Sequence, residues 1–259
     1  MDGIFHAHVK PMAAGDASIA QFALRVVSQI ADGSGIDQGK PRRDLLQLLV
    51  RFARSGDEAV MDRLFVEMKR QRVSAEKMID VYIPAAVSEL GNSWHRGDLD
   101  ILQTTVGTAR VQNLLRELGR AWGADQSGHV DGPRVLLIVP VQEQHSLGAM
   151  IAVNQMRRLG VSVCVQLQPA PHVVTEMVAN RNFDAVFISV ANFSRLESCR
   201  ILVNTIREGS SARVPVVIGG PLVALRPDAV AMTGADVATT SVTDALSACG
   251  LLLQDQAAQ

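Results

Sequence analysis

Residues 143–148 read Glu-Gln-His-Ser-Leu-Gly and place a carboxylate, an imidazole and a glycine at a spacing that suits metal binding. A carboxylate beside a histidine can fix the tautomer of the ring and raise its basicity, so Glu143 would orient His145 as a metal ligand. Gly148 would let a large ring approach the backbone. The alternative is a polar loop with an incidental histidine, and this hexapeptide alone leaves that alternative open.

Two later segments carry residues that suit ligand binding at the ends of short β-branched runs. Ser189-Val190-Ala191 supplies a hydroxyl, and Gly219-Gly220-Pro221 supplies a floor without side chains. We expect each segment to follow a buried strand, as the loop with His145 does. The three segments would then lie at one edge of a sheet.

The second half of the chain alternates short apolar runs with helical stretches. Strands are predicted at residues 135–140, 161–166, 185–190, 214–219 and 236–239, and helices at residues 147–159, 172–180, 196–208, 222–233 and 242–253. Five strands that alternate with helices indicate a parallel sheet covered on both faces. In such a Rossmann-like α/β domain the ligand site lies beyond the carboxyl ends of the strands.

The first half predicts an all-α helical bundle. Apolar residues recur at helical spacing over residues 17–31, 44–54, 58–70, 75–96 and 101–121. Ser74 and Asp100 are predicted N-caps, with Gln103 completing a capping box, while Pro84 should interrupt its helix and Gly97 should end it.

The domain organisation follows from these patterns. We expect a flexible tail at residues 1–16, a helical bundle at 17–121, a linker at 122–133 and an α/β domain at 134–254. His6 and His8 in the tail and His129 in the linker are expected to be solvated.

Composition narrows the classes of function. Hydrophobic residues make up 47% of the chain and charged residues 20%, which is typical of a folded globular protein. A net charge of -1 gives no support to nucleic-acid binding, although it does not exclude it. Cys164, Cys199 and Cys249 form no CxxC unit, so we expect reduced core thiols. No segment suggests a signal peptide or a membrane span, and the expected location is the cytoplasm.

The order and spacing of these segments resemble the cobalamin-binding pattern D-x-H-x-x-G, S-x-L, G-G. Glu143 stands where that family usually has Asp, and Ala191 where it usually has Leu. The resemblance implies that His145 replaces the dimethylbenzimidazole of the cofactor as the lower ligand of cobalt, with Glu143 as its hydrogen-bond partner. It further implies that the displaced tail of the cofactor runs along a slot at Ser189, Val190, Gly219 and Gly220.

Residues 81–118 are similar to the helical cap of methionine synthases, corrinoid carriers and light-sensing B12 regulators of the CarH type. The resemblance places Trp94 over the upper face of the corrin, although Trp94 could also simply complete an apolar helix stripe. His95 would be an upper cobalt ligand, with water as the alternative. Thr104-Thr105 stands where CarH-type proteins have the Glu-His that shields an adenosyl group, which favours hydroxocobalamin over adenosylcobalamin.

Three hypotheses of function remain open from the sequence. The first is a non-enzymatic, light-linked regulator that resembles the AerR/PpaA antirepressors of photosynthesis gene expression and binds a transcriptional repressor protein. The second is a corrinoid carrier of a methyltransferase system, although carriers typically follow the histidine with Asp-Ile-Gly-Lys-Asn rather than the Ser146–Met150 run found here. The third is a flavodoxin-like domain with another ligand or none, which the missing GxGxxG and P-loop motifs disfavour.

Overall fold

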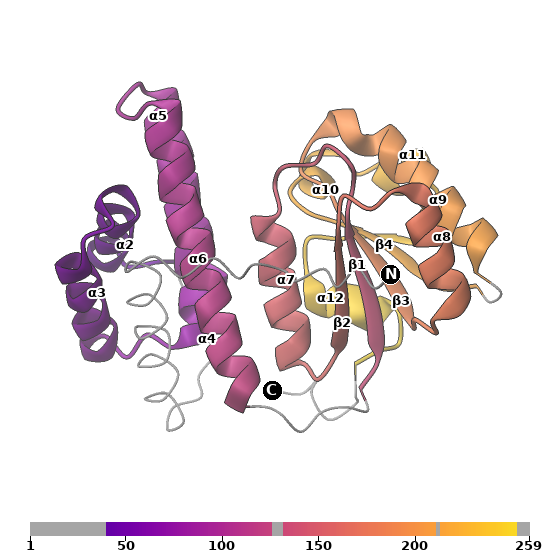
Figure 1. Cartoon of the computed structure of the whole chain (residues 1–259), viewed down its shortest axis with the longest axis horizontal. Coiled ribbons are helices and arrows are strands. Elements are labelled where there is room, and N and C mark those ends of the chain that lie inside the picture. The colour runs from indigo at the N-terminus through magenta and orange to yellow at the C-terminus, as the bar shows by residue number, and fades with distance from the viewer. Residues whose placement is uncertain (1–39, 126–131, 211–212, 253–259) are drawn as a thin grey trace, which may run out of the picture. The chain divides into compact units, whose positions relative to one another are not determined.

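The protein is described by a computed structural model that covers residues 40–125, 132–210 and 213–252 (Figure 1). The chain divides into two compact units, residues 1–125 and 126–259. The predicted tail and the predicted helix at 17–31 lie outside the described residues, as do His6, His8 and His129.

The first unit is helical throughout its described part. Its elements are α2 (Arg43–Ser55), α3 (Glu58–Arg70), α4 (Ala75–Lys77), the π-helical turn η1 (Met78–Tyr82), α5 (Ile83–His95) and α6 (Ile101–Asp125). The helices bury one apolar face each, and the largest fully buried side chains include Tyr82, Phe52, Leu45, Leu64, Leu90 and Leu114. Burial of these faces stabilises the bundle more than helix propensity does.

Local signals in the sequence explain where these helices begin and end. Ser74 accepts a hydrogen bond from the Lys77 amide at 3.1 Å. Asp100 and Gln103 form the predicted capping box, with reciprocal bonds of 2.7 and 3.0 Å. Gly97 adopts a left-handed φ of 81° at the turn after α5.

The predicted interruption at Pro84 is also confirmed. Proline has no amide hydrogen and cannot donate to the preceding turn. The helix widens just before it, so that the Ile83 amide donates to the Met78 carbonyl across the π-helical turn. The single helix expected at 75–96 is therefore built from three consecutive pieces.

The second unit contains a five-stranded parallel sheet in the order β2-β1-β3-β4-β5. The strands are β1 (Arg134–Val139), β2 (Ser162–Leu167), β3 (Ala185–Ser189), β4 (Val216–Gly219) and β5 (Val237–Ala238). The helices are α7 (Leu147–Arg158), α8 (Pro171–Asn180), the 3-10 turn η2 (Phe193–Arg195), α9 (Leu196–Gly209), α10 (Leu222–Leu225), α11 (Ala229–Thr233) and α12 (Val242–Ala248). The predicted fold class is confirmed.

Alternation along the strands explains why helices cover both faces of this sheet. Leu136 and Ile138 pack in the core that contains α8 and α9 residues. Val135, Leu137 and Val139 point to the other face, into the core that contains α7 and α12 residues. Because successive side chains of a strand point to opposite faces, β1 is buried on both sides.

Several predicted boundaries are wrong. Residues 122–125 continue α6 instead of opening the linker, since Gly123 alone does not end a helix. The helix expected at 222–233 is two short helices, because the residue before Pro227 is pushed out of the helical region and Arg226 has φ -135° and ψ 85°. The last helix stops at Ala248 rather than at residue 253. Gly250, two residues after its end, has a left-handed φ of 70°.

Candidate functional site

The predicted site residues of the second unit gather at the carboxyl edge of the sheet. The chain leaves β1 through a loop that carries Glu143 and His145, and it leaves β3 at Ser189. β1 and β3 are hydrogen-bonded neighbours, and strand order reverses between them because β2 lies on the far side of β1. This is the switch point at which open parallel sheets bind ligands.

The Glu143 side chain is the structural centre of this edge. Its carboxylate is 1% exposed and accepts four hydrogen bonds. Oε1 accepts from the His145 amide at 2.9 Å and faces His145 Nδ1 at 2.7 Å. Oε2 accepts from the amides of Ala191 and Asn192 at 3.0 and 3.2 Å. One buried carboxylate thus ties the loop after β1 to the segment after β3.

The charge of Glu143 decides the tautomer of His145. Burial acts to raise the pKa of Glu143, but the hydrogen bonds from His145, Ala191 and Asn192 outweigh burial and hold that pKa below 4.5. An ionised carboxylate only accepts hydrogen bonds, so Nδ1 of His145 carries the proton and donates it. In the neutral ring Nε2 then keeps its lone pair, on a side chain that is 69% exposed. This arrangement leaves one imidazole nitrogen ready to bind a metal.

Cys199 lies in the core near this carboxylate and takes no part in such chemistry. Burial, with a contribution from the negative charge of Glu143, raises the pKa of Cys199 to about 12. Its thiol stays protonated at neutral pH. Cys164, Cys199 and Cys249 are all free thiols, as the sequence predicted.

Replacing Glu143 with glutamine should lower stability in a pH-dependent way. A glutamine nitrogen cannot accept, so backbone donors at the loop would be left without partners at a cost of about 1–3 kcal/mol. Because the folded pKa of Glu143 lies below 4.5, its ionised form stabilises the fold above that pH, and this contribution is lost as the pH falls through the folded pKa. We expect the gap in thermal midpoint between wild type and Glu143→Gln to be widest above pH 5 and to close in acid.

The matched control for this measurement is Glu176→Gln, which changes an exposed glutamate on α8. Its midpoint should follow that of the wild type at every pH. A Glu143→Gln protein as stable as the wild type at pH 7 would contradict the central place given to this carboxylate.

The glycines at this edge have two different functions. A Cβ at Gly148 would meet nothing within 4 Å, and a Cβ at Gly219 would lie 3.6 Å from the Thr239 carbonyl oxygen. Gly220 differs, because its φ is 109° and a Cβ there would lie 2.2 Å from the Val190 carbonyl oxygen. Gly148 therefore borders open space and Gly219 has room for an ordinary van der Waals contact, whereas Gly220 is required by the backbone itself.

Ser189 and Gly219 are direct cross-strand partners in the β3–β4 pairing. The Ser189 hydroxyl is half-buried and makes no hydrogen bond within the described part of the chain, so it is available to a ligand. Val190 is different, since its side chain is fully buried in the core and its amide donates to the Gly219 carbonyl at 2.9 Å. Val190 shapes this edge through its backbone.

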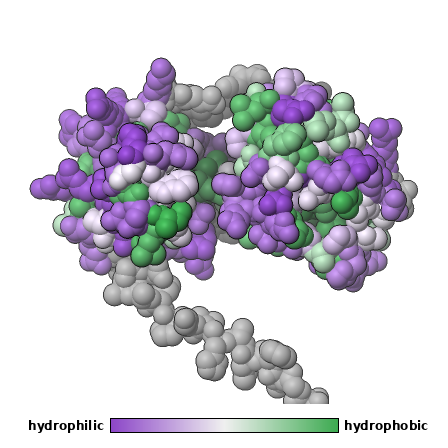
Figure 2. All heavy atoms as spheres, turned by 90° about the horizontal axis from the view of Figure 1, so that it is seen from above, coloured by the Kyte–Doolittle hydropathy of each residue, from purple (hydrophilic) through white to green (hydrophobic). Residues whose placement is uncertain are grey.

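The structure adds residues that the sequence did not single out. Asn192 donates its amide to Glu143, and Gln168 donates its side-chain amide to the Glu143 carbonyl at 3.1 Å. The end of β2 and the segments after other strands also expose large apolar side chains, namely Leu167 in β2 and Val141, Phe193 and Leu225 after other strands. Figure 2 shows hydrophobic surface on this unit as seen from above. Exposed apolar side chains beside a free imidazole suit a metal held in a broad, largely apolar ring.

Trp94 and His95 belong to the helical unit, at the last turn of α5. Ile79, Ile83 and Leu90 are buried, but Trp94 is 44% exposed and does not complete their stripe. The rings of Trp94 and His95 lie 4.8 Å apart between centroids. An exposed tryptophan next to an exposed histidine is available to a ligand rather than to the core of its own bundle.

Comparisons with known proteins agree with this arrangement. Residues 133–249 match the B12 binding domain family. The chain is 38% identical over 192 residues to an uncharacterized 20.5 kDa protein in the bchF-crtJ intergenic region of Rhodobacter capsulatus, with 74% of this chain and 100% of that protein covered.

One solved structure shares the fold at low sequence identity. The monomethylamine corrinoid protein of Methanosarcina barkeri superposes with a TM-score of 0.60 at 12% identity, over 79% of this chain and 94% of that one. A cobalamin-binding protein from Desulfitobacterium hafniense gives a TM-score of 0.42 at 18% identity, over 79% and 97% of the two chains. Among the described residues, no helix has both the length and the apolar character needed to span a bilayer.

Proposed function

Because the chain belongs to the B12-binding domain family and its cofactor is cobalamin, we propose that it is a regulator that binds the cofactor through His145 and passes its state to a repressor protein. The observation that carries the proposal is the His145–Glu143 pair, in which a buried carboxylate leaves an exposed Nε2 free. When bound, the cofactor supplies a cobalt ion with two axial positions and, in its alkyl forms, a photolabile bond.

The residues of the chain have distinct parts in this proposal. His145 would hold the cobalt of the cofactor through Nε2, and Glu143 would fix the tautomer of His145. Ser189 would hydrogen-bond the displaced base, and the missing side chain at Gly219 would let the tail of the cofactor pass. His95 is the protein group for the upper position, which favours the hydroxo form over a form that already carries an adenosyl group.

Two observations favour a regulator without catalytic function. The exposed Trp94–His95 pair matches the pattern of light-sensing B12 regulators described above. The relative in the bchF-crtJ intergenic region is consistent with a regulator of the AerR/PpaA type. We therefore propose that cobalamin in this chain is a signal, and that the output is association with a transcriptional repressor.

The cofactor preference gives a direct test. Purified protein should retain hydroxocobalamin in darkness. From a solution of adenosylcobalamin it should take up the cofactor only after light has removed the adenosyl group. When the loaded protein is used as bait, it should hold a DNA-binding repressor that the cofactor-free protein does not hold. Equal retention of both forms in darkness would contradict the proposed preference.

The upper ligand gives a second prediction. In protein loaded with hydroxocobalamin, His95→Ala should shift the visible absorption bands, because water replaces an imidazole on cobalt. Asn92→Ala, an exposed residue on the same helix, is the control and should leave the spectrum unchanged. Identical spectra for wild type and His95→Ala would remove His95 from the upper position.

A corrinoid carrier is the second proposal, and the fold similarity to the monomethylamine corrinoid protein favours it. A carrier would give up the methyl group of bound methylcobalamin to a thiol acceptor when a partner methyltransferase is present. A regulator would retain that methyl group in darkness under the same conditions.

A further inference from the structure

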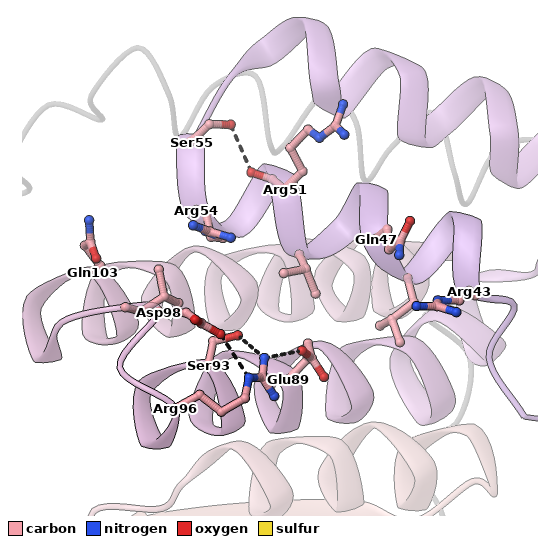
Figure 3. Close-up of a pocket in the computed structure, with 13 residues that line it drawn as sticks. Arg43, Gln47, Arg51, Arg54, Ser55, Glu89, Ser93, Arg96, Asp98 and Gln103 are labelled. Atoms are coloured by element: carbon pink, nitrogen blue, oxygen red, sulfur yellow. Dashed lines mark hydrogen bonds and ion pairs between the residues drawn. The ribbon is translucent and has the colours of Figure 1, made fainter.

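A groove of about 1060 Å³ crosses the helical unit, between α2 and the segment that runs from α5 into α6 (Figure 3). On the α2 side, the residues that line the groove all lie on one face of the helix. Leu46 and Val50 from α2 and Leu99 from the loop give it an apolar floor, and all three are at least partly buried. The groove lies within the helical unit, whereas His145 belongs to the second unit.

The α2 side of the groove carries positive charge. Arg43, Arg51 and Arg54 are exposed on α2, and within the described part of the chain their guanidinium groups make no ion pair or hydrogen bond. On the opposite wall, Arg96 is neutralised by Glu89 at 3.0 Å and Asp98 at 2.9 Å. The α2 wall therefore presents three arginines that can bind an anionic ligand.

We propose that this groove binds an acidic amphipathic segment of the partner protein, with its carboxylates on the α2 arginines and its apolar side chains on Leu46, Val50 and Leu99. The inference rests on the proposed function, since it assigns the surface that meets the regulated partner. Guanidinium groups pair well with carboxylates, and an apolar floor suits a helix that has one apolar face.

The same features disfavour nucleic acid. A phosphate backbone offers no apolar face to the floor of the groove. The whole chain has a net charge of -1, whereas proteins that hold phosphate backbones usually carry a basic excess.

The groove is also connected to the turn that carries Trp94 and His95. Ser93 and Arg96, on either side of this pair in sequence, both line the groove, and Arg96 donates to the Ser93 hydroxyl at 3.1 Å. A shift of this turn when His95 gains or loses a ligand would move Ser93 and Arg96. A change in the ligand of His95 would therefore alter the partner surface through these two residues.

The test uses full-length protein loaded with hydroxocobalamin and the fluorescence anisotropy of three labelled probes. These are a helical peptide with Glu and Leu on opposite faces, the same peptide with Gln for Glu, and a DNA duplex. The groove variant is Arg51→Glu/Arg54→Glu. The control is Arg63→Glu/Arg116→Glu, which makes the same charge change at exposed positions of the same unit outside the groove.

The wild type should bind the Glu peptide more tightly than the Gln peptide, and added salt should weaken that binding. The groove variant should lose at least about tenfold in affinity while the control stays within about twofold, because reversing charges at the contact costs more than changing the net charge elsewhere. Equal losses in the two variants, or no preference for Glu over Gln, would overturn the proposal. Duplex DNA that binds more tightly than the peptide and is lost in the groove variant would overturn it in favour of nucleic acid.

The absorption of bound cobalamin in the same samples separates this inference from the proposed function. The groove variant should keep the cofactor, because none of its changes touches the His145 edge. If the wild type retains cobalamin but does not bind the Glu peptide, the groove assignment fails alone. If the peptide binds and no cobalamin is retained, the proposed function fails and the groove assignment stands.

Discussion

Replacing His145 by alanine is expected to abolish stable retention of cobalamin while the fold stays intact. His145 is 69% exposed, so its removal leaves no cavity in the core. Loss of a hydrogen-bond partner behind a metal ligand typically costs about 10–100-fold in affinity, so loss of the ligand itself should cost at least about 100-fold. Equilibrium dialysis against hydroxocobalamin measures the change.

Gln144→Ala is the matched control for this experiment. Gln144 is exposed in the same loop, and its backbone carbonyl, which alanine keeps, accepts a hydrogen bond from the Ser146 amide at 3.1 Å. The affinity of the Gln144→Ala protein for cobalamin should equal that of the wild type. A His145→Ala protein that binds as tightly as Gln144→Ala would show that the cofactor is held without this imidazole.

Alanine at Gly220 should destabilise the second unit strongly, whereas alanine at Gly219 should not. At Gly220 the new Cβ would lie 2.2 Å from the Val190 carbonyl oxygen, with φ at 109°. A strained backbone costs about 1–3 kcal/mol, and steric overlap costs about 1–3 kcal/mol more. We expect the thermal midpoint of this unit to fall by roughly 10 °C.

Gly219→Ala separates stability from cofactor binding. Its Cβ would lie at an ordinary 3.6 Å from the Thr239 carbonyl oxygen, so the midpoint should stay close to that of the wild type. The added methyl group would instead narrow the space beside Ser189 and weaken cobalamin binding. If Gly219→Ala bound cobalamin normally, the passage assigned to the tail of the cofactor would not run past Gly219.

Much of the sheet could be predicted because its signals are local. Each buried strand is a short β-branched run, and parallel connection places the ends of β1, β3 and β4 at one edge. These local signals are enough to predict that His145, Ser189 and Gly219 lie at the same edge of the sheet. The capping residues Ser74 and Asp100 can also be predicted from the sequence, since each accepts a hydrogen bond from the backbone amide three residues further along.

The remaining features depend on contacts between distant segments. The second oxygen of Glu143 binds the amides of Ala191 and Asn192, and this requires the exact approach of the β3 end to the β1 loop. Glutamate is longer than the aspartate usual at this position, and here it reaches His145 Nδ1 and both of those amides. The exposure of Trp94 is likewise set by how the helices pack, because its helical spacing alone was compatible with a buried stripe.

The split of the helix at 222–233 could have been found, since Pro227 restricts the residue before it. The groove beside α2 could not, because the arginines of α2 form an ordinary exposed face until α5 and the loop at Leu99 are placed opposite them. Surfaces made by two elements need the three-dimensional structure.

The central claim is that His145 itself is a cobalt ligand, and electron paramagnetic resonance tests it most directly. The protein is prepared as the His95→Ala variant, so that the other proposed histidine ligand is absent, with ¹⁵N-labelled histidine; it is then loaded with unlabelled cobalamin and reduced to the Co(II) state. An axial ¹⁴N nucleus splits each cobalt line into three, whereas ¹⁵N splits it into two. Doublets in the labelled protein, and triplets in protein with ordinary histidine, are the predicted result. Triplets in both samples would show that the base of the cofactor still occupies the lower position, and would contradict the account.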